Sequence, residues 1–230
     1  MAVLDALQST ALRCIGQKPT SIFSASSGIA LELSDIVNEA AKDILRAHDW
    51  TKLQVLQSSA GDGTTQAFTL PSDFDRWPKL VSIFTTQWPG VPYQRARDLD
   101  EWYFNRKFVY AGVPGWWLVQ AGKLNIYPAP GAGVNVEYYY ISNGIVTPSA
   151  GAAKPAFTAD DDTFVLPERL LTLACIWRWK SMKGLEYAEH MQNYEIALSQ
   201  EISNDKGPRI LAEGKRRIPV PLAYPGVLGH

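Results

Sequence analysis

Cysteine, histidine and long apolar runs are scarce in this sequence. The two cysteines, Cys14 and Cys175, lie far apart and form no C-x-x-C pair, which argues against a disulfide scaffold or a thiolate metal site. The three histidines share no spacing typical of metal ligands. No apolar run approaches the roughly 18 residues of a membrane-spanning helix. We therefore expect a soluble protein with no bound metal and no membrane partner.

An excess of either charge is also missing. The 22 Lys and Arg residues against 23 Asp and Glu residues give a net charge of −1, so no overall basic field indicates nucleic-acid binding. Residues 207–230 carry four basic side chains and one acidic, a net charge of +3, which leaves −4 for the rest. The loop at Gly131–Gly133 lacks the third glycine of a dinucleotide-binding motif, so we expect no cofactor. Asp5 in the apolar N-terminal stretch argues against a secretory signal.

Apolar and aromatic residues are plentiful. The chain has 230 residues, enough for one large domain or for a domain with an insertion. Its 46% hydrophobic and 20% charged residues are ordinary for a globular protein. Of the 26 aromatic residues, 17 lie between Phe68 and Tyr140. This concentration indicates that the middle third of the chain differs in structure from its flanks.

Helical periodicity marks both ends of the chain. Apolar residues at helical spacing predict a helix over 3–15 and a second one that follows the cap candidate Ser27 and ends near Trp50. Pro167 fits the first position of a third helix, which Gly184 ends. A 3.6-residue period then continues to Ile202, so the last two helices form a hairpin.

Strand patterns replace the helical ones in the middle of the chain. A hairpin is expected over 53–70, with Asp62-Gly63 in its turn, and a second one around Ala121-Gly122. Residues 134–140 alternate as a third strand, and 98–107 form a short charged helix.

These patterns predict an α+β fold. A helical bundle is built from the N-terminal segment 1–50 and the C-terminal hairpin 158–206, with a β-rich insertion over 51–157 and an extended C-terminal arm over 207–230.

Two acidic clusters are candidates for chemistry. Asp160–Asp162 suggests calcium, but the loop lacks the glycine and the distal glutamate of an EF-hand, so a solvated loop before a helix is favoured. Asp98 and Asp100 are candidate paired carboxylates of a glycan-degrading enzyme. Four basic neighbours favour an ion-paired helix surface instead, and we expect no enzyme.

The aromatic residues allow two interpretations. Trp116-Trp117 with Tyr138–Tyr140 form either a platform that stacks on sugars or bases, or the core of a small β-structure with a subunit contact. A small sheet needs large side chains to build any core, so the second interpretation is favoured.

Four segments, in their order and spacing, resemble the head-to-tail adaptor (connector) proteins of tailed bacteriophages. They are 70–76 (LPSDFDR), 124–130 (LNIYPAP), 165–171 (VLPERLL) and 177–189 (WRWKSMKGLEYAE). The resemblance extends from about Ile29 to Lys206. It implies a structural virion protein without catalysis, and a β-rich insertion between helices agrees with it.

The resemblance also implies a position and a set of partners. The protein would form a ring, commonly of twelve copies, below the portal protein in the neck of the virion, and would be assembled in the host cytoplasm. Tail or nozzle proteins would bind below it, and double-stranded DNA would pass through the lumen without specific binding. The alternative function is a carbohydrate-binding tail accessory module that uses exposed aromatic residues.

The sequence assigns surfaces to these partners. The C-terminal arm alternates apolar residues with prolines and carries a short basic cluster, which suggests an extended segment that orders on a partner protein. We expect it to dock on the portal through Arg209, Ile210, Leu211, Lys215, Arg216, Arg217, Ile218 and Val220. The helices are expected to carry ring and portal contacts. The loops with Trp88 and Pro89, and with Pro128 and Pro130, are expected to face the tail.

Overall fold

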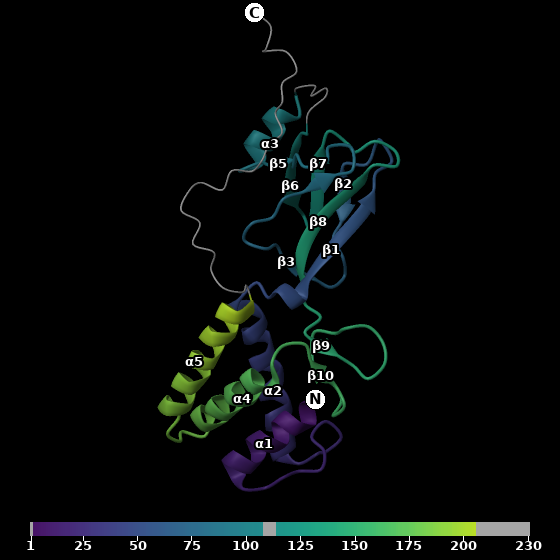
Figure 1. Ribbon diagram of the computed structural model, residues 1–230. Coiled ribbons are helices and arrows are strands. Elements are labelled where there is room, and N and C mark those ends of the chain that lie inside the picture. Colours follow the sequence, from purple (N-terminus) through teal and green to yellow (C-terminus); the bar gives the residue numbers. More distant parts are fainter. Residues whose placement is uncertain (1, 108–113, 206–230) are drawn as a thin grey trace, which may run out of the picture.

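Helices from both ends of the chain pack together in the computed structural model, which describes residues 2–107 and 114–205. Figure 1 shows α1, α2, α4 and α5 grouped at one end of the molecule, with most of the strands and α3 at the other. The elements of this helical region are α1 (Val3–Ile15), α2 (Gly28–Ala47), α4 (Glu168–Met182) and α5 (Ala188–Asp205). Each of the other three helices packs against α4.

Local signals set the helix ends. The Ser27 hydroxyl accepts a hydrogen bond from the Ala30 N–H at 3.3 Å and caps α2, as predicted. Gly16, with φ of 71°, ends α1 in the left-handed conformation that glycine adopts without strain. Pro167 is the cap of α4 rather than its first helical residue.

The helical region has its own apolar core. Leu7 of α1, Val37 and Ile44 of α2, and Leu171 and Cys175 of α4 are fully or almost fully buried in it. The short strands β9 (Val146–Thr147) and β10 (Thr163–Phe164) pair with each other and contribute to the same core. Burial raises the pKa of the Cys175 thiol, as expected for a cysteine that serves as a small core residue.

Two small sheets form the other region. In the first, β8 (Asn135–Ser142) lies between β1 (Gln54–Ala60) on one edge and β3 (Phe74–Arg76) and β4 (Phe84–Thr85) on the other. The second has the order β2 (Ala67–Thr69), β7 (Lys123–Tyr127), β6 (Trp116–Gln120) and β5 (Gln94–Arg95), and α3 (Leu99–Asn105) follows β5. Buried side chains of both sheets share a second core, which includes Trp117 and Tyr138.

The hairpin predicted over 53–70 is wrong. β1 pairs with β8, from Gln54 opposite Ile141 to Ala60 opposite Asn135, whereas β2 pairs with β7 in the other sheet. The intervening loop is held elsewhere: the Gly61 N–H donates to the Val134 carbonyl at 2.8 Å, and the Asp62 carboxylate accepts from the following backbone. The chain therefore crosses between sheets at this point instead of folding back on itself.

The other predicted elements of the middle third are confirmed. β6 and β7 form a hairpin, and Ala121 and Gly122 in its turn have φ of 51° and 70°. In β8, Val136, Tyr138 and Tyr140 are buried while Tyr139 is exposed. The α+β fold class is confirmed, and the C-terminal arm with its eight docking residues lies outside the described residues.

Candidate functional site

The acidic loop before α4 is a structural element. Asp160 accepts a hydrogen bond from the Ser21 hydroxyl at 2.5 Å, and Asp162 accepts from the Thr158 N–H and the Lys154 ammonium group, both at 2.8 Å. The prediction of a solvated loop holds for Asp161, which is exposed, but is wrong for Asp160 and Asp162, whose carboxylates anchor the surrounding chain. Within the described residues, no cluster of three or more ligating side chains that could hold a metal ion is present.

The candidate carboxylates of a glycan-degrading enzyme are positioned by α3. Asp98 is the N-terminal cap of this helix and accepts from the Glu101 N–H at 2.8 Å, while Asp100 is exposed in its first turn. The Arg95 guanidinium, one of the four basic neighbours, lies over the ring of Trp117, 5.5 Å from its centroid. A helix-capping role accounts for Asp98 without any chemistry.

The aromatic cluster is largely core. Trp117, Tyr138 and Tyr140 are 1–3% exposed, and the ring of Trp77 packs on Trp117 and Tyr138 with centroid distances of 5.7 and 5.1 Å. Burial raises the pKa of Tyr138 to about 12. The core interpretation is confirmed for these three residues, which cannot serve as a stacking platform for sugars. Trp116 is half-buried.

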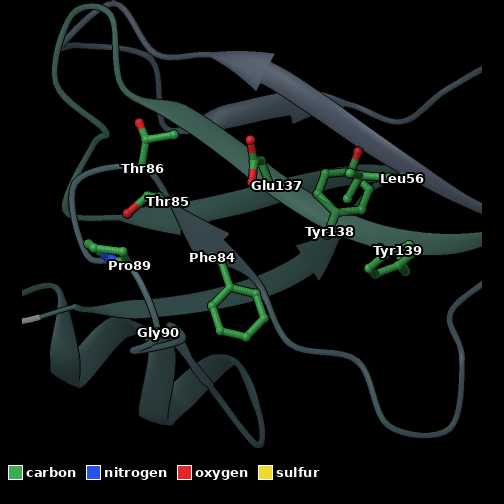
Figure 2. A pocket seen from close by; sticks show the side chains of 9 residues that line it. All are labelled: Leu56, Phe84, Thr85, Thr86, Pro89, Gly90, Glu137, Tyr138 and Tyr139. Atoms are coloured by element: carbon green, nitrogen blue, oxygen red, sulfur yellow. The ribbon is translucent and has the colours of Figure 1, made fainter. Parts of the chain in front are cut away.

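An apolar groove lies on the outer face of the first sheet (Figure 2). Leu56 of β1 stands opposite Tyr139 of β8, and Phe84 of β4 stands opposite Glu137. Leu56, Phe84 and Tyr139 are 52%, 37% and 53% exposed, and the groove has a volume of about 450 Å³. An open apolar hollow of this kind suits contact with another chain rather than catalysis. Its other lining residues are Thr85, Thr86, Pro89, Gly90 and Tyr138.

The two loops expected to face the tail lie side by side. The Thr86 N–H donates to the Asn135 carbonyl and the Asn135 N–H donates to the Thr86 hydroxyl, both at 3.0 Å. These bonds join a residue before the first loop to a residue after the second. Pro89 is exposed and lines the groove, whereas Trp88 and Pro128 are half-buried. Pro130 is buried: a Cβ atom on Gly61 would lie 2.8 Å from its Cβ.

Arg76 joins the sheet to the helical region. Its guanidinium donates to the carbonyls of Leu45 and His48 at 2.9 and 2.8 Å and forms an ion pair with Asp49, with an N–O distance of 3.3 Å. These carbonyls lie at the C-terminal end of α2, where no following helical turn supplies backbone N–H donors to them. Arg76 ends the segment 70–76 that carries the family resemblance, but the sequence alone indicated no role for it.

Asp73 of the same segment holds β3 against β8. Its carboxylate accepts hydrogen bonds from the Tyr140 hydroxyl at 2.8 Å and from the Ser142 hydroxyl at 2.7 Å. Burial and the neighbouring Asp73 charge both raise the pKa of Tyr140. The segment 70–76 therefore serves to place the sheet on the helical region.

Asp205 makes a second connection at the same junction. The last residue of α5 accepts hydrogen bonds from the Thr51 N–H at 2.9 Å and the Thr51 hydroxyl at 2.7 Å, and lies 3.4 Å from the His48 ring nitrogen. Thr51 begins the short 3-10 helix η1 (Thr51–Leu53), which leads directly into β1. Asp205, the last residue that the structure describes, therefore lies beside the segment that enters β1.

Comparison with known proteins finds a match to a protein family. No curated protein sequence matches the chain. The model of the SU10 adaptor protein family matches residues 1–217, which adds the first helix and part of the C-terminal arm to the region of resemblance found above. Because the match covers nearly the whole chain, the protein belongs to the SU10 adaptor protein family.

Proposed function

We propose that the protein is a structural adaptor in the virion of a tailed bacteriophage. It forms a ring, commonly of twelve copies, below the portal protein, joins the capsid to the tail and continues the DNA channel. The observation that carries this proposal is the family match over residues 1–217. A structural adaptor needs no catalytic group, and the capping role of Asp98 agrees with a protein that is not an enzyme.

The exposed apolar surface of the helical region supports a ring. A cyclic ring requires two different faces of each subunit to meet, and such contacts bury apolar side chains. The Lys183 ammonium group lies 2.7 Å from the Glu32 carboxylate, which brings the start of α2 next to the end of α4. Exposed apolar residues gather around this contact and along α5: Leu31, Met182, Leu185, Tyr187, Met191 and Ile196.

A separate apolar surface, the groove on the first sheet, lies in the other region of the molecule. Pro89 lines this groove, which supports the proposal that the loop at 88–92 contacts later tail components. The loop at 128–133 lies next to it through the Thr86–Asn135 hydrogen bonds and would contribute to the same surface.

The C-terminal arm is proposed to dock on the portal. Three consecutive basic residues, Lys215–Arg217, give a weak and salt-sensitive contact alone, but a ring presents many copies of them at high effective concentration. The −4 charge of the rest of the chain suits a lumen that lets DNA pass without binding it during ejection. The subunits would be assembled in the host cytoplasm and end in the virion neck.

The proposal is tested by native mass measurement of the purified protein, alone and mixed with the portal protein of the same phage. We expect a complex with the portal that contains multiple copies. Deletion of residues 207–230 should abolish portal association while the subunit stays folded, as its circular dichroism and a cooperative unfolding transition would report. Portal binding that survives the deletion contradicts the docking role, and a protein that forms no complex with the portal contradicts the adaptor proposal.

A further inference from the structure

The outer edge of β1 is an unprotected strand edge. All seven residues of β1 pair with β8 in continuous register, and no strand in the described parts of the chain pairs with the other edge. β1 contains no charged residue and no proline, and Val55 and Leu56 are 38% and 52% exposed. Strands of this kind attract other strands, so proteins cover or interrupt them.

The last described residue before the C-terminal arm lies close to one end of β1. Asp205 is hydrogen-bonded to Thr51, three residues before Gln54, the first residue of β1. The twelve residues 206–217 span up to roughly 40 Å when extended, against a length of roughly 23 Å for β1. The next residues of the arm can therefore reach any point on the edge of the same subunit.

The sequence at 218–222 suits an edge strand. In Ile218-Pro-Val-Pro-Leu222, apolar residues alternate with prolines. Residues two apart in a strand direct their N–H groups to the same side. Ile218, Val220 and Leu222 therefore present three donors on one side of this strand. The prolines between them have no N–H, so the other side presents no donor. A residue before proline favours the extended conformation, which reduces the entropy lost when the strand forms.

We propose that residues Ile218–Leu222 add to the outer edge of β1 in the same free subunit. Their apolar side chains would continue the exposed row of Leu56 and Tyr139. Pro219 and Pro221 would then form the new edge, which cannot accept a further strand, so the pairing ends there.

One consequence rests on the proposed function. Ile218 and Val220 are also proposed to contact the portal, so a subunit with its arm on β1 must release these residues before it docks. The portal would then compete with β1 for the same segment, which would hold unassembled subunits in a form with low portal affinity.

Amide hydrogen exchange of the full chain tests the pairing, with the mass of the exchanging species measured in parallel. The amides of β1 that do not bond to β8 should exchange at least about tenfold more slowly in the full chain than after deletion of 207–230. Val220→Pro removes a donor directed at β1 and should behave as the deletion does. Ala223→Pro lies on the outward side and is the matched control, so it should keep the protection.

Equal exchange of β1 in the full and shortened chains overturns the proposal, as does protection that is lost equally in both proline variants. Protection found only in dimers would assign the edge to a second copy and also overturn it. Portal binding is not part of this measurement, so failure of the pairing and failure of the adaptor function remain distinguishable.

Discussion

Asp162 shows how one side chain organises the start of the helical region. Its carboxylate accepts the N–H groups of Thr158 and Ala159 and the Lys154 ammonium group, and its carbonyl accepts the Val3 N–H at 2.7 Å. Burial alone would raise the pKa of this carboxyl, but the hydrogen bonds from Lys154 and the two backbone groups outweigh it and hold the pKa below the ordinary value of an aspartate. In the sequence, three consecutive aspartates look alike.

Replacement of Asp162 by Asn should destabilise the protein by about 1–3 kcal/mol at pH 7, since it removes a charged acceptor from three donors. A carboxyl whose pKa is lowered by folding stabilises the protein above its unfolded pKa of about 3.9, and this contribution disappears as the pH falls through the folded pKa. The difference between wild type and Asp162→Asn should therefore shrink below pH 4. Urea unfolding at pH 7 and near pH 3 measures it.

Asp161→Asn is the matched control, because Asp161 is exposed beside the same loop. Its unfolding free energy should change by less than about 0.5 kcal/mol at either pH. A loss as large as that of Asp162→Asn would mean that the loop responds to its total charge rather than to the hydrogen bonds of Asp162.

At the scale of the elements, the turn of the β6–β7 hairpin contains a residue in a backbone conformation that its side chain does not favour. Ala121 has φ of 51°, where a residue with a Cβ atom is strained and Asn is better tolerated. Ala121→Asn should raise the unfolding free energy by about 0.5 kcal/mol, whereas Ala121→Val should lower it. Thermal unfolding checks the change. Ala132→Asn, at an exposed turn position without positive φ, should have little effect, and an equal gain there would refute the explanation.

Elements with short-range signals were predictable from the sequence. The Ser27 cap, the Ala121-Gly122 turn and the alternation in β8 each lie within a few residues, and all three are confirmed. The pairing of β1 with β8 was not predictable, because about eighty residues separate the strands and only the packed core selects their register. The groove needs that register to bring Leu56 beside Tyr139.

The apolar stripe around α5 predicted only part of the buried surface of the helix. Tyr194, Leu198 and Ile202 pack against the core of the helical region, as a helical period predicts, but Tyr187 and Met191 of the same period are exposed. Periodicity identifies the face of a helix but not how far along that face a partner extends. The unburied end of the stripe belongs to the surface that we assign to ring contacts.

The whole molecule has two apolar cores that meet at a narrow junction. One core lies among the helices and the other between the sheets. Arg76 of β3 crosses the junction and bonds the end of α2, while the bonds between Asp205 and Thr51 join α5 to the entry of β1. We expect these polar contacts to couple the unfolding of the two cores.

Arg76→Met should uncouple the two cores. It leaves the Leu45 and His48 carbonyls without their donor, and we expect a loss of about 2 kcal/mol together with a broadened or split unfolding transition. Calorimetry compares the measured enthalpy with the van't Hoff enthalpy, which should be equal in the wild type and unequal in the variant. Lys79→Met is the control, because this exposed residue contacts Asp49 through its backbone N–H, which the substitution keeps. A single sharp transition in Arg76→Met would contradict the coupling.

The attachment of Asp205 to Thr51 also determines how the molecule bears tension. A pull on the chain beyond Asp205 loads the two hydrogen bonds to Thr51, at 2.9 and 2.7 Å, together with the final turn of α5. Thr51 continues directly into β1, whose ladder with β8 resists sliding along its length. Force that enters at this end is therefore shared between α5 and the β1–β8 ladder.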